Sequence, residues 1–166
     1  MRYTVAFVAL AVVCAAATAA DTERYRLKGD TDFSSLFPSS GSAEYVIPFD
    51  KTYEELTPVQ QGRLKSAYVE MGNADEPPFP TGGLQALYKP IATGQQRGLM
   101  TSGLFRAEVE IDEQGSPITF VVYNSPSDSV TKFVANIVML TKFKPALCSG
   151  SPCKMGFPVR ITFETR

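Results

Sequence analysis

The chain of 166 residues is long enough for one domain, and its 16 lysines and arginines nearly balance 17 aspartates and glutamates, giving a formal net charge of −1. No basic cluster is present to neutralise a row of phosphates, which argues against a nucleic-acid partner. The absence of histidine removes the commonest general base and the commonest metal ligand.

The first twenty residues have the pattern of a secretory signal. Arg2 gives a positive start, residues 5–17 are almost wholly apolar, and small residues follow. This pattern predicts cleavage after Ala20 and export of residues 21–166. A transmembrane anchor is the alternative, but the apolar run is short and ends in small residues. Cys14 could suggest the lipid-attachment cysteine of a lipoprotein. Its position early in the apolar run favours instead a cysteine with no separate role inside the signal.

The segment that follows is predicted to be a weakly ordered arm. Residues 21–42 are polar and show little periodicity. Residues 43–49 are typical of a short strand or an extended segment, and Pro48 would confine such a strand to a sheet edge.

A capped helix is predicted next. Thr57, Pro58 and Gln60 supply an N-cap, a proline at the first helical position and the partner residue of a capping box. The helix is expected to end at Gly72. Its apolar face would consist of Leu64, Ala67, Tyr68 and Met71.

Proline and glycine mark the connection to the remaining chain. Residues 75–80 predict a stiff, polyproline-like connector, which we interpret as a rigid lead-in rather than a ligand for another module. Gly82 and Gly83 precede a predicted short helix over residues 84–91. Residues 93–103 predict a flexible loop that lacks a phosphate-binding glycine pattern.

A strand hairpin is predicted over residues 104–123. Residues 104–111 alternate, so that Phe105, Ala107, Val109 and Ile111 share one face. Residues 112–117 form the turn, where Gly115 can adopt a positive φ. Residues 118–123 are β-branched or aromatic, which predicts a returning strand buried on one or both faces.

A helix should follow this hairpin, with Ser127 or Ser129 as its N-cap. Pro145 is expected to stop it after Lys142 and Lys144, which would complement the helix dipole. One apolar stripe along it contains Val130, Phe133, Val134, Ile137, Val138 and Thr141.

The last predicted element is an amphipathic strand. One face carries Phe157, Val159, Ile161 and Phe163, and the other carries Pro158, Arg160, Thr162 and Glu164. The expected fold class is therefore α+β, a small antiparallel sheet with the order strand, turn, strand, helix, strand, packed on helices and preceded by an N-terminal helical extension. We divide the chain into a signal peptide (1–20), an arm with its capped helix (21–76) and the sheet domain (77–166).

Cys148 and Cys153 are the cysteines that remain after signal cleavage. Export and an even count favour a disulfide between them. A metal site would need two further soft ligands, and no histidine or third cysteine is left to supply them. A redox-active pair is the alternative, but a four-residue spacer differs from the two-residue spacing of thiol-exchange enzymes.

No pattern in the chain predicts catalysis or a cofactor. Ser125, Ser127 or Ser129 could form a dyad with Lys132, but a helix cap explains these serines more simply. Paired carboxylates such as Glu108 and Glu110 fit a solvated strand face. We therefore expect a protein that is not an enzyme and that holds no metal or cofactor.

Several short motifs occur in one order. They are Pro78-Phe79-Pro80, Gly103, Asp112 with Gly115, Ser125, residues 142–146 (Lys-Phe-Lys-Pro-Ala), and residues 158–163 (Pro-Val-Arg-Ile-Thr-Phe). In order and spacing they resemble the C-terminal domain of the TonB energy transducers, over roughly residues 77–165. The resemblance implies the TonB C-terminal fold and a periplasmic location.

The resemblance also implies a binding function. TonB-like domains bind short segments of outer-membrane transporters as an added strand. The closing strand is then the candidate partner-binding edge, made of Phe157, Val159, Arg160, Ile161, Thr162 and Phe163. The alternative is that this strand is simply the edge of the sheet, protected by Pro158 and by charges. Expected partners are transporter segments or other envelope proteins. We expect proline at Ile161 to unfold the sheet and proline at Thr162 to be tolerated only if that amide faces outward.

One departure from the family limits what carries over. An energy transducer needs a retained anchor and a long spacer, whereas this chain has neither in evident form. We therefore expect a secreted binding or accessory module rather than a motor. A structural or self-associating envelope protein is the alternative, and a short inner-membrane transducer is a second alternative if residues 1–20 are retained.

Overall fold

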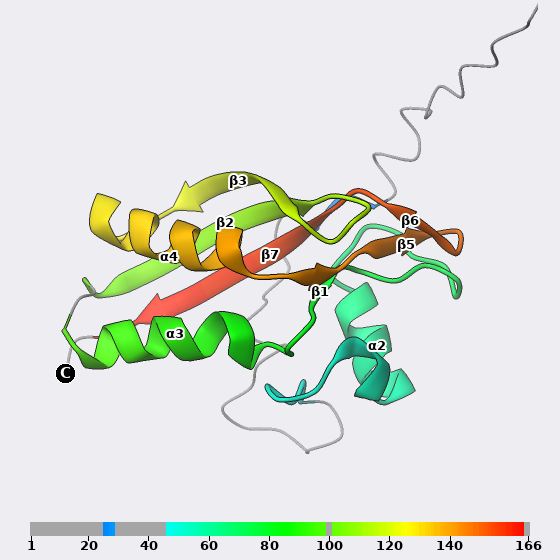
Figure 1. The fold of residues 1–166 in the computed structure, drawn as a ribbon, viewed down its shortest axis with the longest axis horizontal. Coiled ribbons are helices and arrows are strands. Elements are labelled where there is room, and N and C mark those ends of the chain that lie inside the picture. Colours follow the sequence, from blue (N-terminus) through cyan, green and yellow to red (C-terminus); the bar gives the residue numbers. More distant parts are fainter. Residues whose placement is uncertain (1–24, 29–45, 99–100, 165–166) are drawn as a thin grey trace, which may run out of the picture.

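The centre of the fold is a three-stranded antiparallel sheet of order β3-β2-β7, seen in a computed structural model that describes residues 25–28, 46–98 and 101–164 (Figure 1). Its strands are β2 (Gly103–Ile111), β3 (Pro117–Asn124) and β7 (Met155–Phe163). The α+β class is confirmed at this level. The signal-peptide prediction for residues 1–20 lies outside the described residues.

The predicted alternation of β2 is confirmed. Phe105, Ala107, Val109 and Ile111 are all buried, whereas the intervening residues are only partly so. The turn to β3 places Gly115 at a φ of +78°. Asp112 stabilises this turn, since its Oδ1 accepts hydrogen bonds from the amides of Gln114 and Ser116 at 3.0 and 2.7 Å.

Helix α4 (Asp128–Leu140) packs one apolar stripe into the core. Val130, Val134 and Val138 are fully buried. Ser127 is the N-cap, and its hydroxyl accepts from the amide of Val130. The helix ends before the predicted stop at Pro145, because β4 (Phe143–Lys144) pairs instead with β1 (Phe79–Pro80).

Helix α3 (Gln85–Gln96) runs alongside β7 and contacts α4 (Figure 1). It continues beyond the predicted short helix and includes Pro90 and Gly94, so the predicted flexible loop from residue 93 was wrong at its start. The burial of Ile91 and Gly94 explains the extension, because tertiary packing outweighs the weak helix propensity of glycine.

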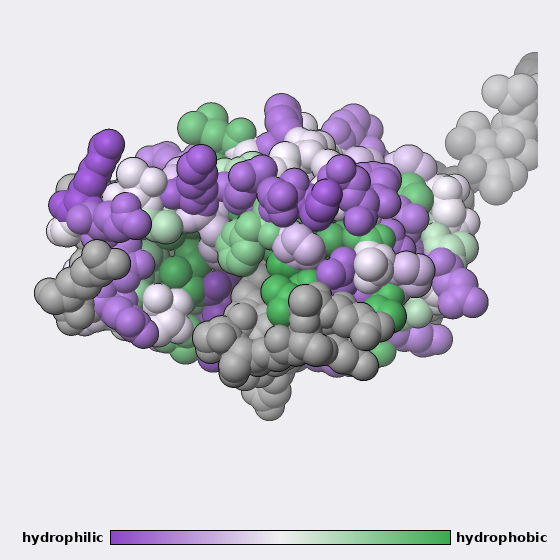
Figure 2. Space-filling view, turned by 90° about the horizontal axis from the view of Figure 1, so that it is seen from below, coloured by the Kyte–Doolittle hydropathy of each residue, from purple (hydrophilic) through white to green (hydrophobic). Residues whose placement is uncertain are grey.

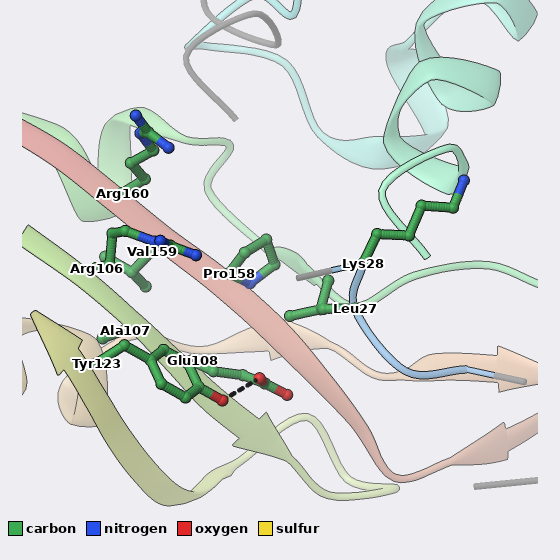
Figure 3. Close-up of a pocket in the computed structure, with 9 residues that line it drawn as sticks. All are labelled: Leu27, Lys28, Arg106, Ala107, Glu108, Tyr123, Pro158, Val159 and Arg160. Carbon is green, nitrogen blue, oxygen red and sulfur yellow. Dashed lines mark hydrogen bonds between the residues drawn. The ribbon is translucent and has the colours of Figure 1, made fainter. Parts of the chain in front are cut away.

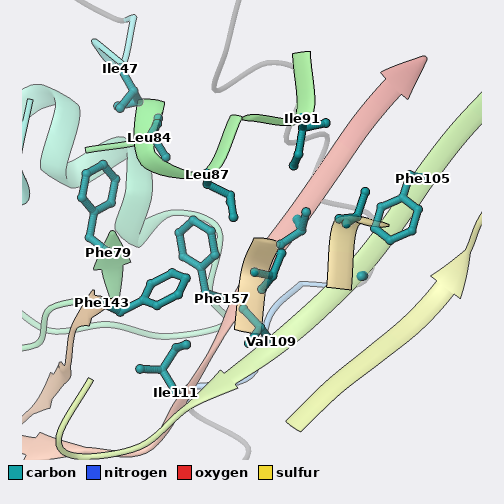
Figure 4. Packing of buried hydrophobic residues seen from close by; sticks show 14 of the residues in the cluster. Ile47, Phe79, Leu84, Leu87, Ile91, Phe105, Val109, Ile111, Phe143 and Phe157 are labelled. Carbon is teal, nitrogen blue, oxygen red and sulfur yellow. The ribbon is translucent and has the colours of Figure 1, made fainter. Parts of the chain in front are cut away.

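The N-terminal extension shares the core of the sheet. A 3-10 helix, η2 (Tyr53–Glu55), precedes α2 (Pro58–Lys65), whose predicted capping box is present. Figure 4 shows Ile47 with Leu84 and Phe79 at one end of the buried cluster, and Phe143 with Phe157 further along. One cluster therefore joins residues from both sides of position 77.

Helix α2 is shorter than predicted. It ends at Lys65 rather than Gly72, because the chain after it turns to meet the arm. The amides of Lys28 and Val69 bond to the carbonyls of Ala67 and Arg26, which makes a bridge between Leu27 and Tyr68.

Two other predictions concern this region. Residues 43–45 lie outside the described part, and residues 46–49 form no strand, although Ile47 is fully buried. The connector is fixed in place as expected for a lead-in. Glu76 bridges to Leu147, and its carboxylate lies 2.7 Å from Lys144 Nζ.

Candidate partner-binding edge

Strand β7 carries the six residues predicted to bind a partner. Phe157, Val159 and Phe163 are buried in the core, and Ile161 is half-buried against it. Thr162 is exposed and Arg160 is half-buried, in the alternate positions of the strand. The two faces of β7 therefore differ as its alternating sequence predicts.

The hydrogen bonds around β7 reveal which backbone groups face away from β2. The carbonyl oxygen of Gly156 accepts from Tyr68 Oη at 2.9 Å. Pro158 lies opposite Glu108 and has no N–H to donate. Because both backbone groups of a residue in an antiparallel strand point the same way, the even-numbered residues of β7 face outward. The outward carbonyl of Glu164 agrees, since it accepts from Gln95 Nε2 at 3.0 Å.

Side chains of the chain itself therefore cover parts of this edge. Tyr68 lies at its beginning and Gln95 just past its end. Tyr88 of α3 lies near its middle. It lines the same groove as Ile161, and burial raises the pKa of its phenol. Burial also raises the pKa of Tyr68.

The uncovered part of the edge is short. Of the described residues, none forms a hydrogen bond with the backbone of Thr162 from outside the sheet, and none reaches the carbonyl of Pro158. These two positions flank Arg160. An added strand would find outward groups here without disturbing the β2–β7 pairing.

A cavity of about 370 Å³ opens on the outer face of the sheet beside this edge (Figure 3). Leu27 and Lys28 of the arm line one side, and Arg106 and Glu108 of β2 line another. Tyr123 of β3 donates from its Oη to Glu108 Oε2 at 2.9 Å. The pKa of Tyr123 is raised, mainly by burial and to a lesser extent by this hydrogen bond.

An apolar groove lies on the other side of β7. It measures about 440 Å³ and is lined by Phe49, by Ile161 and by one side of α3, including Tyr88 and Ala92. Figure 2 views the molecule from the side on which α3 lies and shows apolar surface between polar side chains there. Position 160 thus borders a cavity whose lining includes charged side chains, and position 161 borders an apolar groove.

The opposite edge strand of the sheet, β3, packs on the core through one face only, the lesser of the two burials that were predicted. Ile118, Val121 and Tyr123 are 46%, 45% and 62% exposed. Only Phe120 and Val122 pack against the core. The β-branched composition of β3 was correctly interpreted as a strand, but it gave no information on what covers the strand.

Cys148 and Cys153 form the predicted disulfide, which closes the hairpin of β5 (Ala146–Cys148) and β6 (Ser151–Cys153) with a Cα–Cα distance of 5.7 Å. Asp75, which is 2% exposed, anchors this hairpin through the amide of Ser149 at 2.7 Å. The pair therefore occupies a structural position.

The serines considered for a catalytic dyad serve the start of α4 instead. Ser125 Oγ donates to the carbonyl of Ser127, and Thr131 donates to Ser125 Oγ. Ser129 Oγ lies 3.0 Å from Ser127 Oγ. In the described ranges no group of three or more histidine, cysteine, aspartate or glutamate side chains could hold a metal ion.

Sequence reasoning did not place Tyr68, Tyr88 and Gln95 at the edge of β7. The sequence places Tyr68 on the apolar face of the predicted capped helix, where packing is the simplest role. One signal was present, because a buried tyrosine hydroxyl needs a polar partner and an outward strand backbone supplies one.

We compared the chain with known proteins. No protein-family model, no curated protein and no solved structure matches it. Across residues 25–28, 46–98 and 101–164, no helix is both long enough and apolar enough to cross a membrane.

Proposed function

We propose that this chain is an exported, periplasmic binding module that captures an extended segment of an envelope protein as a strand added to β7. The observation that carries the proposal is the pair of outward backbone positions on either side of Arg160, the backbone of Thr162 and the carbonyl of Pro158, both unpaired among the described residues. Strand edges of this kind bind extended peptides through main-chain hydrogen bonds, and the side-chain pockets beside them give selectivity.

The TonB C-terminal-like fold is part of the proposal. Its support is the order hairpin, helix, strand across β2, β3, α4 and β7, with Gly115 in the turn. The motif residues Phe143 and Lys144 have structural roles, since they pair with β1. Export to the periplasm is proposed from residues 1–20 and from the resemblance, and the intact mass of the exported protein tests the cleavage after Ala20.

The two sides of β7 suggest the kind of segment that would bind. Neighbouring side chains of an added strand point to opposite faces of the sheet. One set would approach the cavity beside Arg160, whose lining includes charged side chains, and the other would approach the apolar groove beside Ile161. The proposed ligand is therefore an extended segment with alternating polar and apolar residues.

The test places a photo-crosslinking residue at position 164, just past the strand, and identifies the crosslinked segments by mass spectrometry. The same experiment is repeated with Thr162→Pro, which removes an outward amide and leaves the β2 pairing intact. We expect crosslinks to extended segments of envelope proteins that disappear in Thr162→Pro. Ile161→Pro is the folding control, because it removes an amide that faces β2.

Retention of the crosslinks in a folded Thr162→Pro variant would refute strand addition at β7. The absence of any crosslinked envelope segment would refute it too. Unfolding of Thr162→Pro would contradict the assignment of its amide to the outer edge.

A further inference from the structure

The outer edge of β3 is the least protected edge of the sheet in the described part of the chain. Strand β3 contains no charged residue, and Ile118, Val121 and Tyr123 are each exposed by more than two-fifths. Irregularities of register lie at its two ends and leave Thr119–Val122 in regular pairing with β2. Soluble proteins normally blunt such edges with charges, prolines or covering segments, because a bare edge pairs with another strand.

The direction of the β3 backbone follows from its pairing. The odd-numbered residues of β2 face β7, so its even-numbered residues face β3. Glu108 and Glu110 are opposite Val121 and Thr119, whose backbone groups therefore point toward β2. The amides and carbonyls of Phe120 and Val122 then point outward, and no described residue outside the sheet bonds to them.

We infer that β3 pairs with β3 of a second copy of this chain, antiparallel and about a twofold axis near Val121. A strand that meets its own copy in this way presents the same groups on both sides, as a closed symmetric dimer requires. Phe120 and Val122 of each copy exchange backbone hydrogen bonds, and the two Val121 side chains lie opposite each other. The three-stranded sheets join into one continuous sheet of six strands.

The charges around β3 favour this partner and this orientation. Because β3 has no charged residue, pairing two copies of it brings no like charges together. For the same reason, β3 itself has no charge with which to attract a charged segment of another protein. The turn before β3 carries Asp112 and Glu113. Antiparallel pairing sets the two acidic turns at opposite ends of the interface, whereas parallel pairing would set them side by side.

The interface is independent of the proposed function. Pairing through β3 leaves the two β7 edges at the two ends of the joined sheet. An experiment can therefore refute peptide binding at β7 without refuting self-association through β3, and the reverse. A single pair of short strands buries less than the roughly 1,200 Å² of a stable interface, so the dimer should be weak and dependent on concentration.

Sedimentation velocity of the purified chain, over about 1 μM to 1 mM, tests the inference in the range where small interfaces associate. Val121→Lys places two like charges at the axis and should weaken association at least about tenfold. Thr162→Lys is the matched control, since it adds the same charge at an exposed position on the other edge strand and should leave association unchanged. Circular dichroism confirms that both variants are folded.

Hydrogen exchange then locates the interface. We expect the amides of Phe120 and Val122 to gain protection as the concentration rises, while that of Thr162 does not change. A chain that stays monomeric throughout the range would overturn the inference. So would a dimer that persists in Val121→Lys, or one in which the amides of Phe120 and Val122 gain no protection.

Discussion

Replacing Gly115 by alanine should destabilise the fold more than a positive φ alone can explain. Gly115 has a φ of +78° in the turn between β2 and β3. A Cβ at this position would overlap the carbonyl oxygen of Phe143 and lie 3.0 Å from its carbonyl carbon. Because the obstacle is backbone, the turn and β4 must move apart.

The magnitude follows from three losses. An alanine in the left-handed region costs about 1–2 kcal/mol. In the structure the Phe143 amide donates a hydrogen bond of 3.0 Å to the Gly115 carbonyl. Moving the turn breaks this bond, and its loss costs about 1 kcal/mol. Partial exposure of Phe143, which is 3% exposed, adds about 1 kcal/mol or more. Together Gly115→Ala should cost about 3–5 kcal/mol, a large share of a typical domain's stability.

Gly150→Ala is the matched control. Gly150 has a φ of +81°, but a Cβ there would meet nothing within 4 Å. Its cost should be about 1–2 kcal/mol, so the difference between the two variants isolates the clash with Phe143. Urea denaturation of both variants measures this difference. Equal losses of stability would refute the packing of the turn against β4.

Three other outcomes are expected. The free energy of unfolding should fall as the pH rises through about 10, because burial raises the folded-state pKa of Tyr68 and Tyr88 and the unfolded chain then binds fewer protons. Denaturation series at several pH values measure how steeply this free energy falls with pH. Tyr68→Phe should make the fall less steep, and an unchanged dependence on pH would contradict the prediction. Replacing both Cys148 and Cys153 by alanine should cost about 2 kcal/mol in denaturation experiments, and a neutral result would mean that the hairpin contributes little. Thr57→Ala should cost about 1 kcal/mol, because Thr57 Oγ1 accepts from the amide of Gln60, and a thermal unfolding midpoint equal to that of the parent chain would rule out this cap.

Local chemistry made the elements of the sheet predictable. The alternation of residues 104–111 and 157–163, the cap at Thr57 and the valine stripe of α4 are short-range patterns with few alternative structures. The boundaries that failed depend on distant partners. Helix α2 ends early because residues 67–69 meet residues 26–28, and α4 ends early because β4 meets β1.

The candidate site was predictable only in part. Alternation identifies which side chains of β7 face the core, but it is silent on what lies beside the strand. The coverage by Tyr68, Tyr88 and Gln95 arises from how α3 and the segment after α2 pack against β7. The exposure of β3 is likewise a property of packing, because a β-branched strand has the same sequence pattern whether it is covered or bare.

Pro158 has a consequence for how β7 is aligned during folding. A slip of β7 by one residue along β2 would turn Phe157, Val159 and Phe163 toward solvent. It would also aim the imide nitrogen of Pro158, which has no proton, at a β2 carbonyl that needs a donor. The hydrophobic pattern and the proline thus each disfavour the same shifted pairing. Either one alone would favour the observed register of β7 on β2.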